Sequence, residues 1–372
     1  MRVAVLTSSR ADYGIYMPLL KRIKMDPFFD LELVVFGTHL SRFHGYTIDQ
    51  IRADGFEPFV TIDSIALGDS PEAIAGTMGL TIARFASYWG EAKERIQLAV
   101  CLGDRFEMFA AVSASVPFNI PLAHIHGGET TFGAIDDAFR HSLTHMARHH
   151  FTSSEEHALR VAQLVGSKDG VYNVGALSLD NLEEFEPYSE AEFEARFGIG
   201  VDANTILVTL HPETRGVDVV EQHAQIVAES LAGEPYFKAL VTMPNADTAG
   251  TKIRNVFRAL AAKHPDRIEL AENLGTRGYF TAMSRCAFLL GNSSSGIIEA
   301  ASFGKRVINL GDRQKGRSSS PNVMHVPFNR EELQMVMTRI KELPNSGKEN
   351  IYFQGGASRR IVKVLKEIHG HD

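Results

Sequence analysis

The chain has 372 residues, of which 44% are hydrophobic and 22% charged, and 38 basic against 45 acidic side chains give a formal net charge of -7. This composition argues against a disordered chain, and the acidic balance argues against a surface that follows nucleic-acid phosphates or an anionic membrane. Only Cys101 and Cys286 are present, both inside apolar runs. We therefore expect two buried thiols, no disulfide framework and no cysteine-based zinc site.

The N-terminal apolar stretch ends at Leu6, which is too short for the hydrophobic region of a signal peptide. No window of the sequence reaches 18 apolar residues, the length that a membrane-spanning helix requires. These two features predict a cytoplasmic protein that does not cross a membrane.

Short apolar runs alternate with longer segments of helical period, which is typical of βαβ units and a parallel sheet. Residues 10–25 form a typical intervening helix. In the first half, the predicted strands are residues 3–6, 31–36, 98–102, 121–125, 150–152 and 172–174. In the second half, they are residues 206–210, 239–243, 268–270, 288–290, 307–310 and 323–326.

The polar, acid-rich stretch 178–194, which contains Pro187, separates the two sets of strands. Length also favours two domains, since single domains usually have about 100 to 200 residues. We expect an N-terminal Rossmann-like domain over residues 1–177 and a C-terminal one over residues 178–356.

Polar clusters follow almost every predicted strand. In open parallel sheets, ligands bind beyond the carboxyl ends of the strands, where loops and helix N-termini converge. Two sheets whose polar edges face one another would form a cleft between the domains. The clusters are residues 7–14, 103–105, 124–129, 211–214, 244–247, 291–296 and 311–317.

The segment 291–300 combines a strand end, three serines and a helix start, a pattern that suits a diphosphate held by backbone N–H groups. It is not a Walker A loop, and no G-x-G-x-x-G occurs in the chain, so ATP and NAD are disfavoured. It is not a G-x-S-x-G nucleophile elbow either. The alternative is a serine-rich helix cap, in which Glu299 would lie on a plain helix surface.

Cationic side chains in the strand-end loops suit the same phosphates, because the planar fork of arginine bonds two oxygens at once. Lys315 is the exception, since an isolated lysine is more often a solvated surface charge. The arginines of these loops are Arg10, Arg105, Arg313 and Arg317.

The densest titratable cluster surrounds His124, His126 and Glu129. Spacing of His141, His145 and His149 by four residues more often marks a helix face than a zinc site, and no H-E-x-x-H occurs. General acid and base chemistry fits better, with an imidazole from His126. Asp104, Glu129 and Asp136 would supply carboxylates, although Asp136 or Asp137 is also well placed to cap a helix.

These motifs resemble the hydrolysing UDP-N-acetylglucosamine 2-epimerases of bacterial sialic-acid pathways. The resemblance implies two Rossmann-like domains in a glycosyltransferase-B arrangement with an interdomain active-site cleft, and a last helix, near 357–372, that joins the first domain. It also implies a cytoplasmic homodimer or homotetramer with no metal and no cofactor. The matching segments are residues 9–14, 102–105, 124–129, 140–142, 211–214, 245–247, 291–296 and 311–317.

The resemblance also assigns roles. Asp104 and Asp136 match acid/base positions and Glu129 ends the same signature. His126 stands where some relatives carry glutamate, so which group handles which proton stays open. The backbone of Leu274 would contact the uracil. Glu299 would bind the ribose, and the serines would bind the diphosphate. The residues expected to hold the UDP-sugar are Arg10, Arg105, His211, Asn245, Leu274, Ser293, Ser294, Glu299 and Arg313.

The implied reaction removes the C2 proton while UDP leaves C1, and water then adds to the resulting glycal with inversion at C2. The expected substrate is UDP-N-acetylglucosamine, giving N-acetylmannosamine for sialic-acid biosynthesis. The alternatives are the same reaction on a UDP-2,4-diacetamido-2,4,6-trideoxy sugar of the legionaminic-acid route, and a glycosyltransferase of the same fold. A non-hydrolysing epimerase and a non-catalytic UDP-sugar sensor are less favoured.

Overall fold

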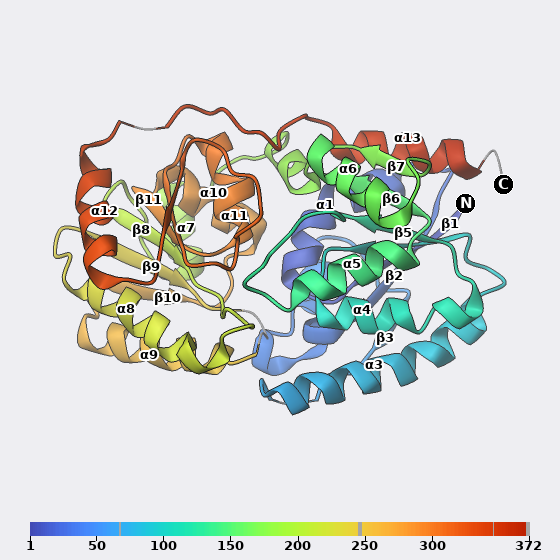
Figure 1. Ribbon diagram of the computed structural model, residues 1–372, viewed down its shortest axis with the longest axis horizontal. Coiled ribbons are helices and arrows are strands. Elements are labelled where there is room, and N and C mark those ends of the chain that lie inside the picture. The colour runs from blue at the N-terminus through green and yellow to red at the C-terminus, as the bar shows by residue number, and fades with distance from the viewer. Residues whose placement is uncertain (67, 245–247, 345, 370–372) are drawn as a thin grey trace. The chain divides into compact units, whose positions relative to one another are not determined.

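The computed structural model describes residues 1–66, 68–244, 248–344 and 346–369. They form two compact units, each with its own parallel sheet (Figure 1). Unit 1 comprises residues 1–129, 136–184 and 352–369, and unit 2 comprises residues 130–135 and 185–351. The division after residue 177 that the sequence suggested stays a prediction of domain organisation.

The sheet of unit 1 is fully parallel, with the strand order β3-β2-β1-β4-β5-β6-β7. This is the 3-2-1-4-5-6 order of a Rossmann fold, extended by one strand. The short edge strand β3 was not predicted, because three residues after a proline give no clear alternation. The strands are β1 (Arg2–Thr7), β2 (Asp30–Phe36), β3 (Val60–Ile62), β4 (Leu98–Leu102), β5 (Leu122–Ile125), β6 (His149–Thr152) and β7 (Val171–Asn173).

Helices cover both faces of this sheet, and alternate strand residues enter two separate cores. Val3 and Val5 pack with residues of α1 and α13, whereas Ala4 and Leu6 pack with residues of α3 and α4. Burial on both faces explains why the strands are continuously apolar. The helices of unit 1 are α1 (Arg10–Met25), α2 (Ile48–Ala53), α3 (Pro71–Ala92), α4 (Phe106–Ser113), α5 (Asp136–Met146), α6 (Glu155–Val165) and α13 (Ala357–His369).

Unit 2 repeats the design with the strand order β10-β9-β8-β11-β12-β13, again 3-2-1-4-5-6 in chain order. One face packs against α8, α9 and α12, and the other against α7 and α10. The strands are β8 (Thr205–Thr209), β9 (Lys238–Thr242), β10 (Ile268–Ala271), β11 (Phe288–Gly291), β12 (Val307–Leu310) and β13 (Val323–Val326). The helices are α7 (Glu190–Phe197), α8 (Val220–Ala232), α9 (Gly250–Lys263), α10 (Gly275–Arg285), α11 (Ser294–Ile298) and α12 (Arg330–Glu342).

In both sheets the strand order reverses between the first and fourth strands of the unit, β1 and β4 in unit 1 and β8 and β11 in unit 2. Loops at such a switch point diverge and leave room for a ligand. The predicted fold class, an α/β chain with two Rossmann-like sheets, is confirmed. One detail was wrong: His149 does not continue a helix face with His141 and His145, because α5 ends at Met146 and His149 begins β6.

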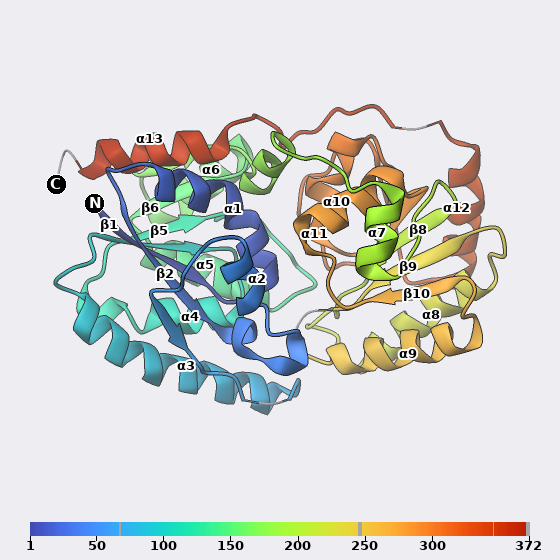
Figure 2. The ribbon, with the colours of Figure 1, turned by 180° about the vertical axis from the view of Figure 1, so that it is seen from behind.

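The last helix lies on unit 1, beside α1, in both views of the chain (Figures 1 and 2). The Arg22 Nε donates to Ser358 Oγ at 2.8 Å, and Asp180 caps α13 by accepting from the backbone N–H groups of Ala357 and Ser358 at 2.9 and 2.6 Å. Unit 1 is therefore completed by a segment that follows all of unit 2 in the sequence.

Both cysteines are buried free thiols, as predicted, and burial raises the pKa of each to about 12. In the part of the chain that the structure describes, none of the helices has the length and apolar character needed to cross a membrane.

Candidate active site

In unit 1, the loop after β4 carries Asp104 and Arg105 at the switch point, and each pairs with a residue of a neighbouring helix. Asp104 accepts a hydrogen bond and ion pair from the Arg140 guanidinium, which belongs to α5 and is almost fully buried. Arg105 forms a two-bond fork with Glu107, with Nε and Nη2 at 3.1 and 3.0 Å from the two carboxylate oxygens. Asp104 remains 24% exposed, so its carboxylate is accessible while its charge is balanced.

Arg10 begins α1, and the start of this helix is fixed by the buried Asp12. One oxygen of Asp12 accepts from the backbone N–H groups of Ser8 and Ser9 at 3.0 and 3.1 Å, completing a capping box. Burial opposes its ionisation, but hydrogen bonds and charge from His39, with Thr7 and Ser8, hold the pKa of Asp12 below its ordinary value. A buried anion therefore sets the orientation of the loop that carries Arg10.

His126 and Glu129 form a buried pair in the loop after β5, with Nδ1 3.1 Å from Glu129 Oε1. The same Oε1 accepts from Ser153 Oγ at 2.8 Å. On the other side of the ring, Nε2 accepts the backbone N–H of Leu177 at 3.3 Å. Because Nε2 accepts, Nδ1 carries the proton and donates it to Glu129, so both ring nitrogens are already engaged.

The backbone of His126 has a φ of +67°, in the left-handed region that a residue with a branched or bulky side chain seldom adopts. Strain of this kind persists only where the surroundings hold the residue in place. The bonds to Glu129 and Leu177 provide that hold. The geometry therefore fits His126 as the group that orients Glu129.

His124 and His150 face each other across the β5–β6 register and are both buried. The ring of His124 lies 2.8 Å from the Gly103 carbonyl oxygen through Nε2 and 3.2 Å from Thr144 Oγ1 through Nδ1. Burial lowers the pKa of His124 and that of His150 to about 4 each, so both are neutral near pH 7. They serve as packed core groups, and His124 also fixes the loop that leads to Asp104.

Asp136 begins α5 in unit 1, but residues 130–135, which join it to Glu129, belong to unit 2. Thr130 Oγ1 donates to the Gly316 carbonyl at 2.6 Å, and the Phe132 and Gly133 N–H groups donate to the carbonyls of Lys315 and Asp312 at 3.1 and 3.2 Å. A Cβ on Gly133 would come within 2.7 Å of the Arg313 nitrogen, so only glycine permits this approach. The segment that joins Glu129 to Asp136 therefore packs against the loop after β12.

In unit 2, Asn292 joins the loops that follow β8, β11 and β12. Its side chain accepts the His211 backbone N–H at 2.7 Å and donates to the His211 carbonyl at 2.9 Å. The backbone carbonyl oxygen of Asn292 accepts from Arg313 Nη1 at 3.0 Å and from Gln314 Nε2 at 2.9 Å. This fully buried residue therefore positions both His211 and Arg313, two of the residues predicted to hold UDP.

Glu213 fixes the same loop from the other side. Its Oε1 accepts the backbone N–H groups of Asp312 and Arg313 at 2.6 and 3.0 Å. Burial raises the pKa of Glu213, while these two N–H groups act in the opposite direction. Glu213 thus holds the backbone of Arg313 as Asn292 holds its side chain.

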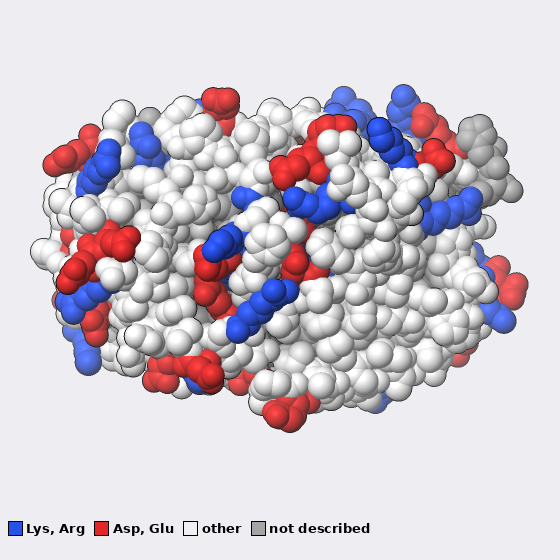
Figure 3. Space-filling model, viewed as in Figure 1, with Lys and Arg blue, Asp and Glu red and all other residues white. Residues whose placement is uncertain are grey.

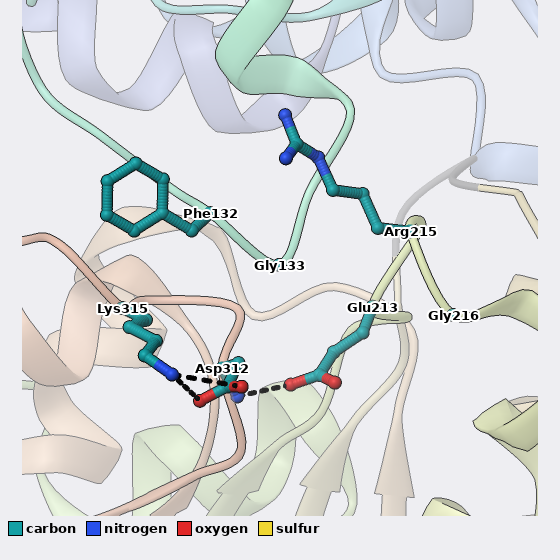
Figure 4. Close-up of a pocket in the computed structure, with 7 residues that line it drawn as sticks. All are labelled: Phe132, Gly133, Glu213, Arg215, Gly216, Asp312 and Lys315. Atoms are coloured by element: carbon teal, nitrogen blue, oxygen red, sulfur yellow. Dashed lines mark hydrogen bonds and ion pairs between the residues drawn. The ribbon is translucent and has the colours of Figure 1, made fainter.

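A shallow pocket of about 370 Å³ adjoins this loop (Figure 4). Lys315 is 63% exposed and pairs with Asp312 at 3.4 Å, as expected for a surface charge. Figure 4 shows the Arg215 side chain directed away from Glu213 and Asp312. The pocket is lined by Phe132, Gly133, Glu213, Arg215, Gly216, Asp312 and Lys315.

The serine triplet begins α11, with Ser293 as the cap residue: its Oγ accepts the Ser295 N–H at 3.3 Å. Gly291 precedes it at a φ of +139°, where a Cβ would lie 1.9 Å from the Thr209 carbonyl oxygen. The strand can therefore turn into the serine loop only through glycine. Ser295 Oγ lies 2.7 Å from the Tyr279 hydroxyl, which connects the triplet to α10.

The remaining predicted residues lie on the same unit or outside the described chain. Leu274 caps α10 and is buried, and Glu299 ends α11 with 7% of its surface exposed. Arg317 donates through Nη1 to Gln314 Oε1 at 2.6 Å. Asn245 lies outside the described residues. Among the residues that are described, no group of three or more His, Cys, Asp or Glu side chains could hold a metal ion.

Sequence reasoning missed Asn292, Glu213 and Tyr279. Asn292 and Glu213 lie inside clusters that were recognised, but their role is to bond backbone groups of other loops, and a linear motif does not show such pairs. Tyr279 lies within a helix, where its residue type indicates only an amphipathic position.

Comparison with known proteins decides the family. A sequence profile described as UDP-N-acetylglucosamine 2-epimerase matches residues 21–366. The chain belongs to the UDP-N-acetylglucosamine 2-epimerase family. This membership makes it an enzyme of the UDP-sugar 2-epimerase type, and the resemblance predicted from the motifs is confirmed.

Several curated relatives align over most of the chain. A UDP-N,N'-diacetylbacillosamine 2-epimerase (hydrolyzing) from Legionella pneumophila is 31% identical over 100% of this chain and 97% of its own. A GDP/UDP-N,N'-diacetylbacillosamine 2-epimerase (hydrolyzing) from Campylobacter jejuni is 30% identical over 88% and 85%. The polysialic acid biosynthesis protein P7 of Escherichia coli is 30% identical over 98% and 94%.

Solved structures share the fold. The UDP-GlcNAc 2-epimerase of Neisseria meningitidis, bound to UDP-GlcNAc, superposes with a TM-score of 0.79 at 18% identity, covering 99% of this chain and 100% of that one. The Methanocaldococcus jannaschii enzyme in complex with UDP-GlcNAc and UDP gives 0.79 at 17% identity, with the same coverage. At these identities the likeness concerns the fold.

Proposed function

We propose that this protein is a hydrolysing 2-epimerase that converts a UDP-activated 2-acetamido sugar and water into UDP and the free sugar inverted at C2. The observation that carries the proposal is the similarity to two relatives named as hydrolysing 2-epimerases, at 31% identity over 100% of this chain and at 30% identity over 88% of it. The clusters described above fit the two functions that this reaction needs. A carboxylate next to a guanidinium in unit 1 suits proton transfer, and the loops of unit 2 suit binding of the anionic diphosphate.

In this mechanism, UDP is held by unit 2. Arg313 and the serine hydroxyls bind the diphosphate. Glu299 binds the ribose hydroxyls, and the Leu274 backbone contacts the uracil. Further contacts come from His211, Asn245, Arg10 and Arg105. The leaving diphosphate gathers negative charge, and donors that are already in place stabilise it without reorganisation. The bonds of Asn292 and Glu213 to Arg313 are the local features that favour such preorganisation.

Proton transfer belongs to unit 1. Asp104, whose negative charge is stabilised by Arg140, accepts the C2 proton while the bond between C1 and the diphosphate breaks. Water then adds its hydroxyl to C1 of the glycal, and a proton returns to the opposite face of C2 from Asp136. Glu129, oriented by His126, assists the addition of water. No metal and no organic cofactor enters these steps.

For the substrate, we propose UDP-N,N'-diacetylbacillosamine, a 2,4-diacetamido-2,4,6-trideoxy sugar nucleotide, ahead of UDP-N-acetylglucosamine. The Legionella pneumophila relative, at 31% identity, is named for UDP-N,N'-diacetylbacillosamine, and the Campylobacter jejuni relative, at 30%, for GDP/UDP-N,N'-diacetylbacillosamine. A Neisseria meningitidis relative named for UDP-N-acetylglucosamine is 25% identical. The two sugars share UDP and the reacting C2 and differ at C4 and C6.

The test is incubation with each sugar nucleotide alone, followed by separation of the products. Release of UDP with a free sugar inverted at C2, and deuterium at C2 in deuterated water, is the expected result. A higher kcat/KM for the diacetamido substrate supports the order given above. UDP release only after an alcohol acceptor is added would instead indicate a glycosyltransferase, and a UDP-bound epimer a non-hydrolysing enzyme.

We also propose that the enzyme works in the cytoplasm as a homodimer or homotetramer. On the face drawn in Figure 3, the surface over α3 and α4 carries few charged side chains. Helix α3 also carries the exposed apolar side chains Leu80 and Ile82. Light scattering on the purified protein tests the assembly.

A further inference from the structure

A line of hydrogen-bonded hydroxyl groups runs from the interior of unit 2 to the serine triplet. The successive oxygen-to-oxygen distances are 2.7, 3.2, 2.7 and 3.0 Å, and the innermost hydroxyl donates to the Val208 carbonyl at 3.3 Å. We call this line the hydroxyl chain; its members are Thr242, Thr209, Tyr279, Ser295 and Ser293.

The hydroxyl chain has five protons for five hydrogen bonds. Each hydroxyl can donate only once. When all five bonds are formed, every proton is directed inward, from Ser293 through Tyr279 to the Val208 carbonyl, and none is left for a ligand. Ser293 then presents lone pairs outward, which is the wrong polarity for a negatively charged diphosphate.

Reversal of the hydroxyl chain corrects this polarity with the loss of a single weak bond. If Thr242 donates to Thr209 instead of to Val208, each following hydroxyl can donate outward, and Ser293 can donate to a phosphate oxygen. The bond given up is the longest of the five at 3.3 Å, and the bond gained is charge-assisted and therefore stronger. Tyr279 is the central link in both directions. Burial raises the pKa of Tyr279 to about 12, so it keeps its proton near pH 7.

We propose that Tyr279 is a positioning residue for the diphosphate: its hydroxyl donates to Ser295, which donates to Ser293, so that Ser293 directs its proton at the ligand. The proposal rests on the proposed function, because it requires UDP at the serine triplet. Donors in a hydrogen-bonded chain polarise one another, so Tyr279 strengthens the outermost bond without contacting UDP.

Two variants with opposite expected effects test the proposal. Tyr279→Phe keeps the ring but removes a hydroxyl that accepts from Ser295 in the inward direction and donates to Ser295 in the outward direction. Under the proposal the loss of this polarising donor outweighs the loss of the acceptor, so UDP affinity is expected to fall about 3- to 10-fold while uridine affinity stays unchanged. Thr242→Val removes the inward acceptor of Thr209, which favours the outward direction. UDP affinity of this variant is expected to stay equal or to rise.

The measurement is calorimetric titration of each purified variant with UDP and with uridine, with urea unfolding as the check on folding. A role in local packing alone would weaken UDP and uridine binding together, or would weaken UDP binding in both variants, and either result would overturn the proposal. Should Tyr279→Phe fail to fold, Ser295→Ala interrupts the neighbouring link and is expected to give the same selective loss.

The wild-type titration separates this inference from the proposed function. A wild-type protein that does not prefer UDP to uridine contradicts the proposed function and the role of Tyr279 together. A wild-type protein with that preference, combined with variants that retain it in full, contradicts only the role of Tyr279.

Discussion

Unit 1 and unit 2 have the same strand order around their switch points, but the loops there are held by different interactions. In unit 1 the charged side chains are paired, Asp104 with Arg140 and Arg105 with Glu107, and Glu129 accepts a hydrogen bond from His126. In unit 2 the loops are held chiefly by side chains that bond to the backbone of other loops, the Asn292 amide and the Glu213 carboxylate, and the serine triplet is linked to α10 by the hydroxyl chain.

This difference indicates how one fold can carry two tasks. In unit 1 the ion pairs orient the carboxylates, as proton transfer requires. In unit 2 the Asn292 amide and the Glu213 carboxylate bond to the loop backbone, which fixes the loops from which Arg313 and the serines would meet a ligand. Variants that change the strand-end loops of one unit at a time test this difference.

The largest effect is expected in unit 1 for Asp104→Asn. This change removes the proposed base and the partner of Arg140, and we expect kcat to fall about 1,000-fold, within the range for general acid/base groups. Deuterium uptake at C2 should disappear, while UDP affinity stays near the wild-type value because unit 2 is intact. The exposed Asp49, 73% accessible, gives the control Asp49→Asn. Unaltered deuterium uptake in Asp104→Asn would rule out the proposed role.

In unit 2, Arg313→Ala is expected to raise the barrier by about 3 kcal/mol, as for the loss of one preset donor to a developing anion. Turnover should therefore fall about 100-fold or more, and UDP should bind more weakly. The matched control is Lys315→Ala in the same loop, since Lys315 is exposed and pairs only at the surface with Asp312. Equal losses in the two variants would contradict a specific role of Arg313.

A smaller effect is expected for Asn292→Asp. The carboxylate can accept the His211 N–H but cannot donate to the His211 carbonyl, so two oxygens oppose each other in a buried site. We expect a loss of about 1 to 3 kcal/mol in the free energy of unfolding, measured with urea, together with weaker UDP binding. Asn204 is exposed, so the same substitution there, Asn204→Asp, serves as the control. Wild-type stability in Asn292→Asp would indicate that the loops are held by other contacts.

The smallest effect is a pH dependence that arises in unit 1. His124 and His150 have pKa values of about 4 when folded and 6.5 ordinarily, so the unfolded chain binds protons that the folded chain does not. Stability is therefore full at pH values well above 6.5 and falls as the pH drops from there toward 4. Between about pH 7.5 and about pH 5.5 each histidine should remove about 1.4 kcal/mol.

Urea unfolding at several pH values measures this loss. In the variant His150→Leu, the contribution of one histidine disappears, and the loss attributed to the pair should fall by about half. An unchanged pH dependence in His150→Leu would show that other groups titrate in this range.

The sequence predicted the positions of the strands and of the polar loops better than it predicted the hydrogen bonds between those loops. Apolar runs located all six strands of unit 2 and all strands of unit 1 except the three-residue β3, because burial on both faces gives a strong local signal. The recognised clusters fall at the carboxyl ends of these strands. A linear pattern carries no information about which atoms of separate loops meet, so the roles of Asn292 and Glu213 required coordinates.

His126 is a second case in which the role of a residue depends on contacts that the sequence does not show. Its residue type indicated a titrating imidazole, but its positive φ and its bond from the Leu177 N–H depend on the loop conformation and on a 3-10 helix more than fifty positions later in the chain. Such contacts decide which residues orient a neighbour.

The position of α13 has a consequence for the order in which the chain folds. One apolar face of the unit 1 sheet is covered partly by Ala357, Ile361 and Leu365, which leave the ribosome after all of unit 2. During synthesis, the later unit can therefore finish folding before the earlier one. A truncated protein that stops at Glu184 would keep every strand of unit 1 and still expose this face, so chaperone binding or aggregation is the expected fate of that fragment.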